Sequence, residues 1–153
     1  MAFGRSLHIG LNHVDPNAYN GWDGELFGCI NDANSMKAIA DSLKYTSMIL
    51  TDSQASSWRV IQEIASASQA LQTGDIYLIT YSGHGGQVHD SNSDEEDAMD
   101  ETWVLWDREV IDDELASLYS PDLVVSVQTL LNAKKSGDAE TQASARRRRR
   151  KSS

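Results

Sequence analysis

The sequence contains a histidine between glycines, a combination that suits acid–base chemistry. His84 follows Gly83 and precedes Gly85 and Gly86 in the run YSGHGG. Glycines let the backbone of a ligand come close, and the amide N–H groups at Gly83 and Gly85 could face an oxyanion. An imidazole there could take a proton from a thiol or give one to a leaving amine near neutral pH. A glycine-rich turn without chemistry has the same composition, so the pattern alone indicates a candidate base.

Cys29 is the only thiol in the chain, and it precedes a segment that is predicted to be helical. A helix N-terminus lowers the pKa of a thiol and makes it more reactive. A free cysteine is more commonly a small buried apolar side chain. Two interpretations therefore stay open, a nucleophile that works with His84 and a packing residue. A single cysteine excludes an internal disulfide and a Cys-based zinc site, and it fits a reducing compartment.

An acidic segment offers a possible cation site. Asp90, Asn92, Asp94 and Glu101 occupy positions 1, 3, 5 and 12 of an EF-hand-like loop, but Glu95 stands where the turn glycine belongs. No helix is predicted before this loop, so a regular EF-hand is not expected. A less regular calcium site would relieve the repulsion between neighbouring carboxylates. A solvated acidic loop is the alternative.

Asp32 and Ser82 lie where a substrate could meet the predicted sheet. An acidic side chain at that position would select a basic side chain by charge pairing. Each residue taken alone is also an ordinary cap or turn residue. The pair is therefore a candidate specificity site that depends on the fold.

The elements that must position these residues alternate between strand and helix. The apolar pattern predicts strands at residues 6–11, 47–50 and 76–81, a helix from Asn31 or Asp32, and a second helix that ends near Gly74. The inner faces of the two helices are predicted to carry Ala33, Met36, Ile39, Ala40 and Leu43, and Val60, Ile61, Ile64, Ala65, Ser68 and Leu71. Residues 76–81 are apolar on both faces, as in strands covered by helices on both sides. We therefore expect an α/β sandwich with a mostly parallel sheet, and His84 follows the carboxyl end of a strand, where ligands of such sheets bind.

The rest of the chain is less regular. Residues 87–102 form a polar, acidic stretch that is predicted to be a loop. Residues 103–106 and 109–111 could form a small hairpin about Asp107 and Arg108. The acids at 112–114 then start a helix, whose N-terminal dipole favours them.

Charge divides the chain into an acidic body and a basic tail. Residues 1–125 hold 5 Lys/Arg against 21 Asp/Glu, and residues 126–153 hold 8 against 2. We expect one domain over 1–125 and a divergent tail over 126–153 that is disordered or helical. The acidic body excludes nucleic acid and membrane as partners and suits cations and basic peptides. The sequence has neither a signal-peptide pattern nor the roughly 18 apolar residues of a membrane span, so we expect a soluble, cytoplasmic protein. We also expect no organic cofactor.

Five motifs in order resemble the caspase-like cysteine peptidases, most closely the metacaspase and bacterial orthocaspase branch. They are IGLN at 9–12, GCINDA at 28–33, YSGHGGQ at 81–87, DEEDAMDETW at 94–103 and IDDEL at 111–115. Each motif is weak alone, but their order and spacing over residues 6 to about 120 are specific. The resemblance implies a three-layer α/β/α sandwich in which a histidine and cysteine dyad cleaves peptide bonds after Arg or Lys, often with calcium dependence.

The resemblance also implies roles for single residues. The dyad histidine of the family matches His84, and its pocket for basic side chains includes the positions of Cys29, Asp32 and Ser82. Calcium ligands are implied at four acids of this chain, first at Asp112 and Asp113 and then at Asp97 and Asp100.

The chain departs from the family after residue 115. Family members continue through another strand into an Asp-Ser-Cys-His-Ser-Gly type motif that supplies the nucleophile, whereas this chain reads VVSVQTL at 124–130 and then turns basic. The abrupt change at about Ser126 resembles out-of-frame translation, and a basic tail that binds polyanions or the acidic body is the alternative. We therefore predict a sandwich that is incomplete at its C-terminal side, with an exposed strand edge.

The leading hypothesis is the large-subunit part of a cysteine endopeptidase, truncated before the catalytic cysteine and inactive alone. Its expected partners are a peptide or protein substrate with Arg or Lys and a complementing small-subunit fragment. Two alternatives stay open. One is a non-catalytic caspase-like module that binds calcium or a basic protein, and the other is a peptidase that uses Cys29 with His84.

Overall fold

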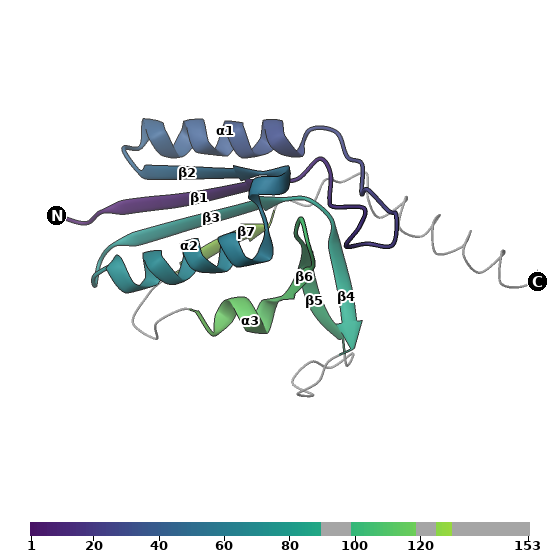
Figure 1. The fold of residues 1–153 in the computed structure, drawn as a ribbon. Helices are drawn as coiled ribbons and strands as arrows, with labels where there is room; N and C mark the ends of the chain where they lie inside the picture. Colours follow the sequence, from purple (N-terminus) through teal and green to yellow (C-terminus); the bar gives the residue numbers. More distant parts are fainter. Residues whose placement is uncertain (90–98, 119–124, 130–153) are drawn as a thin grey trace, which may run out of the picture.

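A computed structural model describes residues 1–89, 99–118 and 125–129. Its main sheet has four parallel strands in the order β2-β1-β3-β7. These strands are β1 (Gly4–Gly10), β2 (Thr46–Thr51), β3 (Ile76–Ser82) and β7 (Val125–Thr129). Helix α1 (Cys29–Ser42) covers one face, and helices α2 (Ser57–Ala70) and α3 (Asp112–Ala116) lie on the other (Figure 1). The predicted three-layer α/β/α sandwich with a mostly parallel sheet is thus confirmed.

The two faces of the main sheet differ in polarity. The face toward α2 holds the apolar core, which includes Leu7, Ile9, Ile79, Val60 and Ile64. Successive strand residues point to opposite faces, so the alternate positions of β1 and β3 lie beneath α1. The buried side chains at those positions are polar, namely Ser6, His8, Thr80 and Ser82, whereas Ile76 is exposed and Leu78 half-buried. Helix α1 therefore rests on a polar layer rather than on a second apolar core.

Observed α1 differs from the prediction in two ways, and this polar layer explains the first. Ala33 and Ala40 are buried as predicted, but Ile39 and Leu43 are 51% and 62% exposed, because the layer below requires small rather than large side chains. The helix also begins at Cys29, earlier than predicted. Its N-cap is Gly28, whose φ of 97° is a left-handed conformation that glycine adopts without strain.

Helix α2 matches its prediction more closely. Val60 and Ile64 are buried, whereas Ile61, Ala65, Ser68 and Leu71 are only half-buried. The helix ends at Ala70, before Gly74. None of the described helices is long and apolar enough to cross a membrane.

A buried histidine lies in the polar layer beneath α1. Ser6 Oγ donates to Ser47 Oγ at 2.8 Å, so its lone pairs can accept from His8 Nε2 at 2.9 Å. His8 Nδ1 then accepts from the Thr80 hydroxyl at 2.8 Å. This arrangement satisfies a neutral ring, and burial disfavours the charged ring that a second proton would create. Burial lowers the pKa of His8 below its ordinary value of 6.5, against a smaller opposing effect of Asp41.

We expect the free energy of unfolding to fall as the pH drops below 6.5, the ordinary pKa that His8 has in the unfolded chain. The unfolded state takes up this proton more readily than the folded state, so the stability is fully present above that pH. Replacing His8 with glutamine should reduce the slope of stability against pH by up to about 1.4 kcal/mol per pH unit. Urea unfolding between about pH 5 and pH 8 measures the slope. His13→Gln, at an exposed position, is the control, and an unchanged slope in His8→Gln would contradict the prediction.

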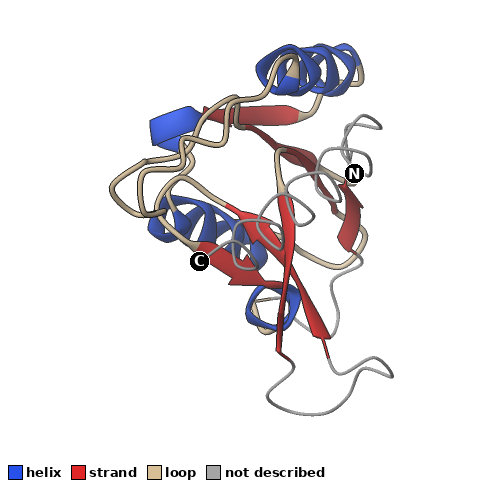
Figure 2. Cartoon of the chain, turned by 90° about the vertical axis from the view of Figure 1, so that its right-hand side faces the viewer, coloured by secondary structure: helices blue, strands red, loops and turns tan. Residues whose placement is uncertain are grey.

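A second, antiparallel sheet projects from the carboxyl side of the main sheet (Figures 1 and 2). Its order is β4-β5-β6, with β4 (Gly85–His89), β5 (Met99–Val104) and β6 (Glu109–Ile111). The hairpin about Asp107 and Arg108 and the start of α3 at Asp112 are confirmed. The predicted loop over 87–102 is wrong at both ends, which are strands. The two strands pair through backbone hydrogen bonds, which require no apolar periodicity. The hydrophobic pattern of the sequence therefore did not predict them.

Strand β7 corrects one expectation about the C-terminal part. It pairs in parallel with β3 from Tyr77 opposite Val125 to Tyr81 opposite Thr129, so the edge of β3 that was predicted to be exposed is paired. The division into a domain at 1–125 and a disordered or helical tail at 126–153 stays a prediction. Alternating β-branched residues in VSVQT favour a strand. Residues 130–153, including the arginine run, lie outside the described residues.

Candidate active site

The candidate site lies at the carboxyl ends of β1 and β3. His84 follows the last residue of β3 by two positions, and the segment 11–28 crosses the same edge on its way from β1 to α1 (Figure 1). The amide of Leu11 donates to the Ser82 carbonyl at 3.0 Å, which ties the two strand ends together. The predicted placement of His84 after a buried strand is therefore confirmed.

The His84 ring is oriented by the segment that crosses this edge. Its Nε2 lies 2.9 Å from the Gly24 carbonyl oxygen. A carbonyl can only accept, so Nε2 carries the hydrogen, and the neutral ring has its lone pair on Nδ1. The indole of Trp22 lies against the same ring, with centroids 4.8 Å apart and an interplanar angle of 55°. Nδ1 is thus the nitrogen that can receive a proton from a substrate or a nucleophile.

The backbone of His84 is fixed from below by Tyr81. The hydroxyl of this buried tyrosine lies 2.6 Å from the His84 carbonyl oxygen and 2.9 Å from the Val104 carbonyl oxygen, so its single hydrogen is shared between these two acceptors. Its ring stacks on Trp103 at 4.9 Å and 7°. Burial raises the pKa of Tyr81, so the hydroxyl stays protonated and remains a donor. Sequence reasoning missed this role, since a tyrosine in an apolar strand reads as core.

The structure brings the predicted pocket residues together. Ser82 Oγ donates to Asp32 Oδ2 at 2.9 Å. Ser82 is buried, and Asp32 is half-buried in the first turn of α1. Cys29 begins the same helix and has no exposed surface. The Ser82–Asp32 pair therefore presents an acid at the edge that also carries His84, whereas the thiol of Cys29 is enclosed.

Among the described residues, the predicted calcium ligands do not form a cluster. Asp112 and Asp113 lie in the first turn of α3, where Asp112 Oδ1 accepts from the Asp113 amide at 3.1 Å. Asp97 lies outside the described residues, and Asp100 is in β5. In the described part of the chain, no group of three or more His, Cys, Asp or Glu side chains could hold a metal ion. Two carboxylates fall short of the six to eight oxygen ligands that calcium takes, so calcium binding stays a prediction and no catalytic step depends on it here.

The other residues of the EF-hand-like segment are only partly described. Asp90, Asn92, Asp94 and Glu95 lie outside the described residues, and Glu101 is in β5. Gly85 begins β4 opposite Trp103. The oxyanion roles of Gly83 and Gly85 stay predictions.

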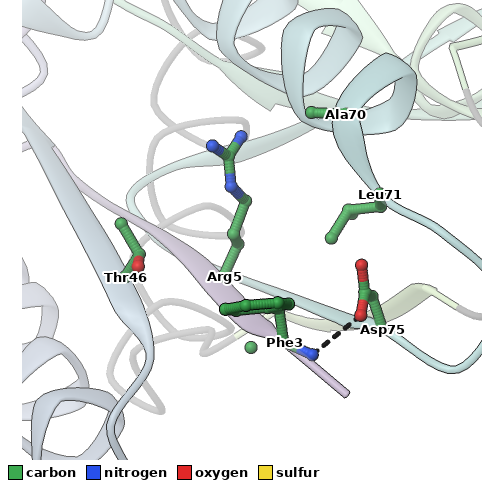
Figure 3. A pocket seen from close by; sticks show the side chains of 7 residues that line it. Phe3, Arg5, Thr46, Ala70, Leu71 and Asp75 are labelled. Carbon is green, nitrogen blue, oxygen red and sulfur yellow. Dashed lines mark hydrogen bonds between the residues drawn. The ribbon is translucent and has the colours of Figure 1, made fainter. Parts of the chain in front are cut away.

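A separate pocket of about 290 Å³ lies at the opposite end of the sheet (Figure 3). Arg5 extends from β1 between Thr46 and Leu71, and the Phe3 amide donates to Asp75 Oδ1 at 2.7 Å. This pocket lies at the amino ends of the strands. It is therefore not part of the His84 site.

Comparison with known proteins identifies the family. Residues 4–139 match the metacaspase, peptidase C14 domain. The chain belongs to the metacaspase family. Metacaspase-1 of Saccharomyces cerevisiae is 36% identical over an alignment of 125 positions that covers 72% of this chain and 28% of that protein. Metacaspase-1 of Eremothecium gossypii is 31% identical over an alignment of 151 positions that covers 88% of this chain and 32% of that protein.

A solved structure agrees with this assignment. A protein of Geobacter sulfurreducens has a TM-score of 0.77 and 44% sequence identity to this chain, and the match covers 84% of this chain and 50% of that one. The resemblance to caspase-like cysteine peptidases is thus confirmed, as is the caspase-like sandwich. The chain spans about a third or less of these curated relatives and half of the solved one.

Proposed function

We propose that this chain supplies the base and the basic-residue pocket of a caspase-type cysteine peptidase and does not cleave peptides alone. The observation that carries the proposal is the Ser82–Asp32 hydrogen bond of 2.9 Å, two residues from the oriented ring of His84. The two features share one edge of the sheet. A substrate side chain bound at Asp32 would therefore bring its backbone toward His84.

The pocket favours Arg or Lys as the residue before the cleaved bond. Asp32 is half-buried and held by Ser82, so its carboxylate is pre-oriented and partly shielded from water. A guanidinium or ammonium group would form charge-assisted hydrogen bonds with it. The acidic body around it attracts the same cations.

The chemistry would proceed by nucleophilic catalysis. His84 Nδ1 accepts the proton of a thiol, and the thiolate attacks the carbonyl carbon of the substrate to form a tetrahedral intermediate. The peptide C–N bond then breaks as the leaving amine takes the proton back from the ring, and water later releases the acyl group. The thiol of Cys29 is fully buried, which argues against it as the attacking group. We propose that the attacking cysteine belongs to a complementing fragment.

A binding test separates this proposal from its alternatives. We expect the purified chain to bind an Arg-terminated peptide by calorimetry and to release no fluorophore from an Arg-linked reporter, with or without calcium. Asp32→Asn keeps the shape but removes the charge, so binding should weaken about tenfold or more. Glu63→Gln, on α2 beside Arg59, is the matched control.

Each alternative predicts a different result. Cleavage that is lost in Cys29→Ala would overturn the inactivity and support Cys29 as the nucleophile. Unchanged affinity of Asp32→Asn for the Arg peptide would remove Asp32 from the pocket. A non-catalytic module would also bind the peptide, but adding a cysteine-bearing small-subunit fragment would not produce turnover.

A further inference from the structure

The indole of Trp22 makes a contact with His84 that the proposed chemistry does not yet use. Trp22 is half-buried, packs on the core, and lies 4.8 Å from the His84 ring, centroid to centroid. We propose that Trp22 is a positioning residue that holds the His84 ring in the plane where Nε2 meets the Gly24 carbonyl. Its importance for catalysis rests on the proposed function of His84. The orientation of the ring does not.

Trp22 is itself held in place. Its amide donates to the Tyr19 carbonyl at 3.1 Å, and the Val14 amide donates to the Asp23 carbonyl at 2.8 Å. The Tyr19 ring meets the indole edge-on at 5.8 Å and 79°. The Tyr19 hydroxyl donates to the Leu105 carbonyl at 2.7 Å, and burial raises the pKa of Tyr19, so this donor persists. Trp22 is thus wedged between an anchored tyrosine and His84.

Gly24 lies beside both groups that constrain the His84 ring, which are its own carbonyl and the Trp22 indole. It adopts a left-handed φ of 61°, and a Cβ there would lie 3.3 Å from the Trp22 indole and 3.4 Å from the His84 ring. The backbone therefore passes close to both rings. Its carbonyl determines which nitrogen carries the hydrogen, and water competes for this hydrogen bond because the site is part-buried. The indole blocks rotation of the ring out of that plane.

The same contact suits both protonation states that a base must visit. An aromatic face attracts a cation, so an imidazolium remains in contact with the indole after it has taken a proton. The neutral ring packs as an aromatic pair. Trp22 can therefore keep the ring in place through a proton transfer in either direction.

The test is NMR of the histidine side chains in the ¹⁵N-labelled full chain, at a pH where the ring is neutral. The native chain should show His84 mainly as the Nε2–H tautomer, with its carbon-bound ring protons shifted upfield by the indole. Trp22→Met has similar bulk without a ring. It should lose the upfield shift and move the tautomer populations toward those of a solvent-exposed histidine, while Trp22→Phe should restore most of both.

Trp58→Met is the matched control, since Trp58 is 67% exposed on α2. Identical His84 nitrogen and proton shifts in Trp22→Met and Trp58→Met would overturn the proposal. If Trp22→Met does not fold, the native chain still decides the matter, because absent upfield shifts and absent indole-to-imidazole NOEs would refute the contact. Failure here with Asp32-dependent peptide binding intact would leave the proposed function standing. The reverse outcome would leave only the positioning role.

Discussion

Replacing Gly83 with alanine should lower the free energy of unfolding by about 1–3 kcal/mol, as overpacking of a filled core does. A Cβ at this position would overlap the Tyr81 hydroxyl oxygen and lie 2.7 Å from Cζ of the same ring. The Tyr81 side chain cannot shift, because it is fully buried and stacked on Trp103, and its hydroxyl is hydrogen-bonded to backbone carbonyls. The chain at residues 83–84 must move instead. Urea unfolding measures the loss, and a variant as stable as the native chain would refute the clash.

A double-mutant cycle identifies Tyr81 as the cause. Tyr81→Phe removes the overlapping oxygen and also leaves the His84 and Val104 carbonyls without this donor, so it destabilises the fold on its own. The double variant Gly83→Ala/Tyr81→Phe should lose less free energy of unfolding than the sum of the two single losses, by about 0.5 kcal/mol or more. Tyr19→Phe also loses a hydroxyl that donates to a backbone carbonyl, and its effect should add to that of Gly83→Ala. Additivity in both pairs would exclude a direct Gly83–Tyr81 conflict.

The local hydrophobic pattern of the sequence was enough to predict the strands and helices whose apolar residues recur at a regular spacing. The apolar run at 76–81 and the periodic residues of α2 predicted a buried strand and its covering helix, because burial there follows from sequence spacing. The α1 face was predicted less well, since its inner side is set by the polar residues His8 and Thr80 on strands that are distant in sequence. Strand β4 carries no apolar signal. Its existence depends on β5, which no local pattern identifies as its partner.

The candidate site divides in the same way. His84, Asp32 and Ser82 stand in short motifs, so their types and spacing could be recognised in the sequence. The residues that orient the base could not, because their roles arise from contacts between separate segments. Trp22 reaches His84 only through the path of the segment after β1, where the Asp15 amide donates to the Trp106 carbonyl at 2.8 Å. Asp52 fixes the start of that path, with a φ of 43° and a carboxylate that accepts from the Asn12 amide at 2.8 Å.

Gly10→Ala should be at least as disruptive as Gly83→Ala, with a loss of about 1–3 kcal/mol in the free energy of unfolding and weaker binding of the Arg peptide. A Cβ on Gly10 would lie 2.5 Å from the Cys29 carbonyl oxygen and 2.9 Å from Ala33 Cβ. That oxygen belongs to the backbone of α1 and cannot rotate away. The first turn of the helix must therefore lift off β1, and it carries Asp32 away from Ser82 as it moves.

Gly74→Ala separates the effect on the site from lost stability. Gly74 has a φ of 96° with open space around its Cα, so alanine there strains the backbone by about 1–2 kcal/mol without touching α1. Both variants should unfold more easily, but only Gly10→Ala should weaken the binding of the Arg peptide under conditions where each variant is folded. Equal affinities in the two variants would mean that Asp32 does not depend on the packing of α1 against Gly10. A selective loss would show that a glycine in the first strand sets the position of the pocket acid, because Gly10 leaves no side chain between the end of that strand and the first turn of the helix.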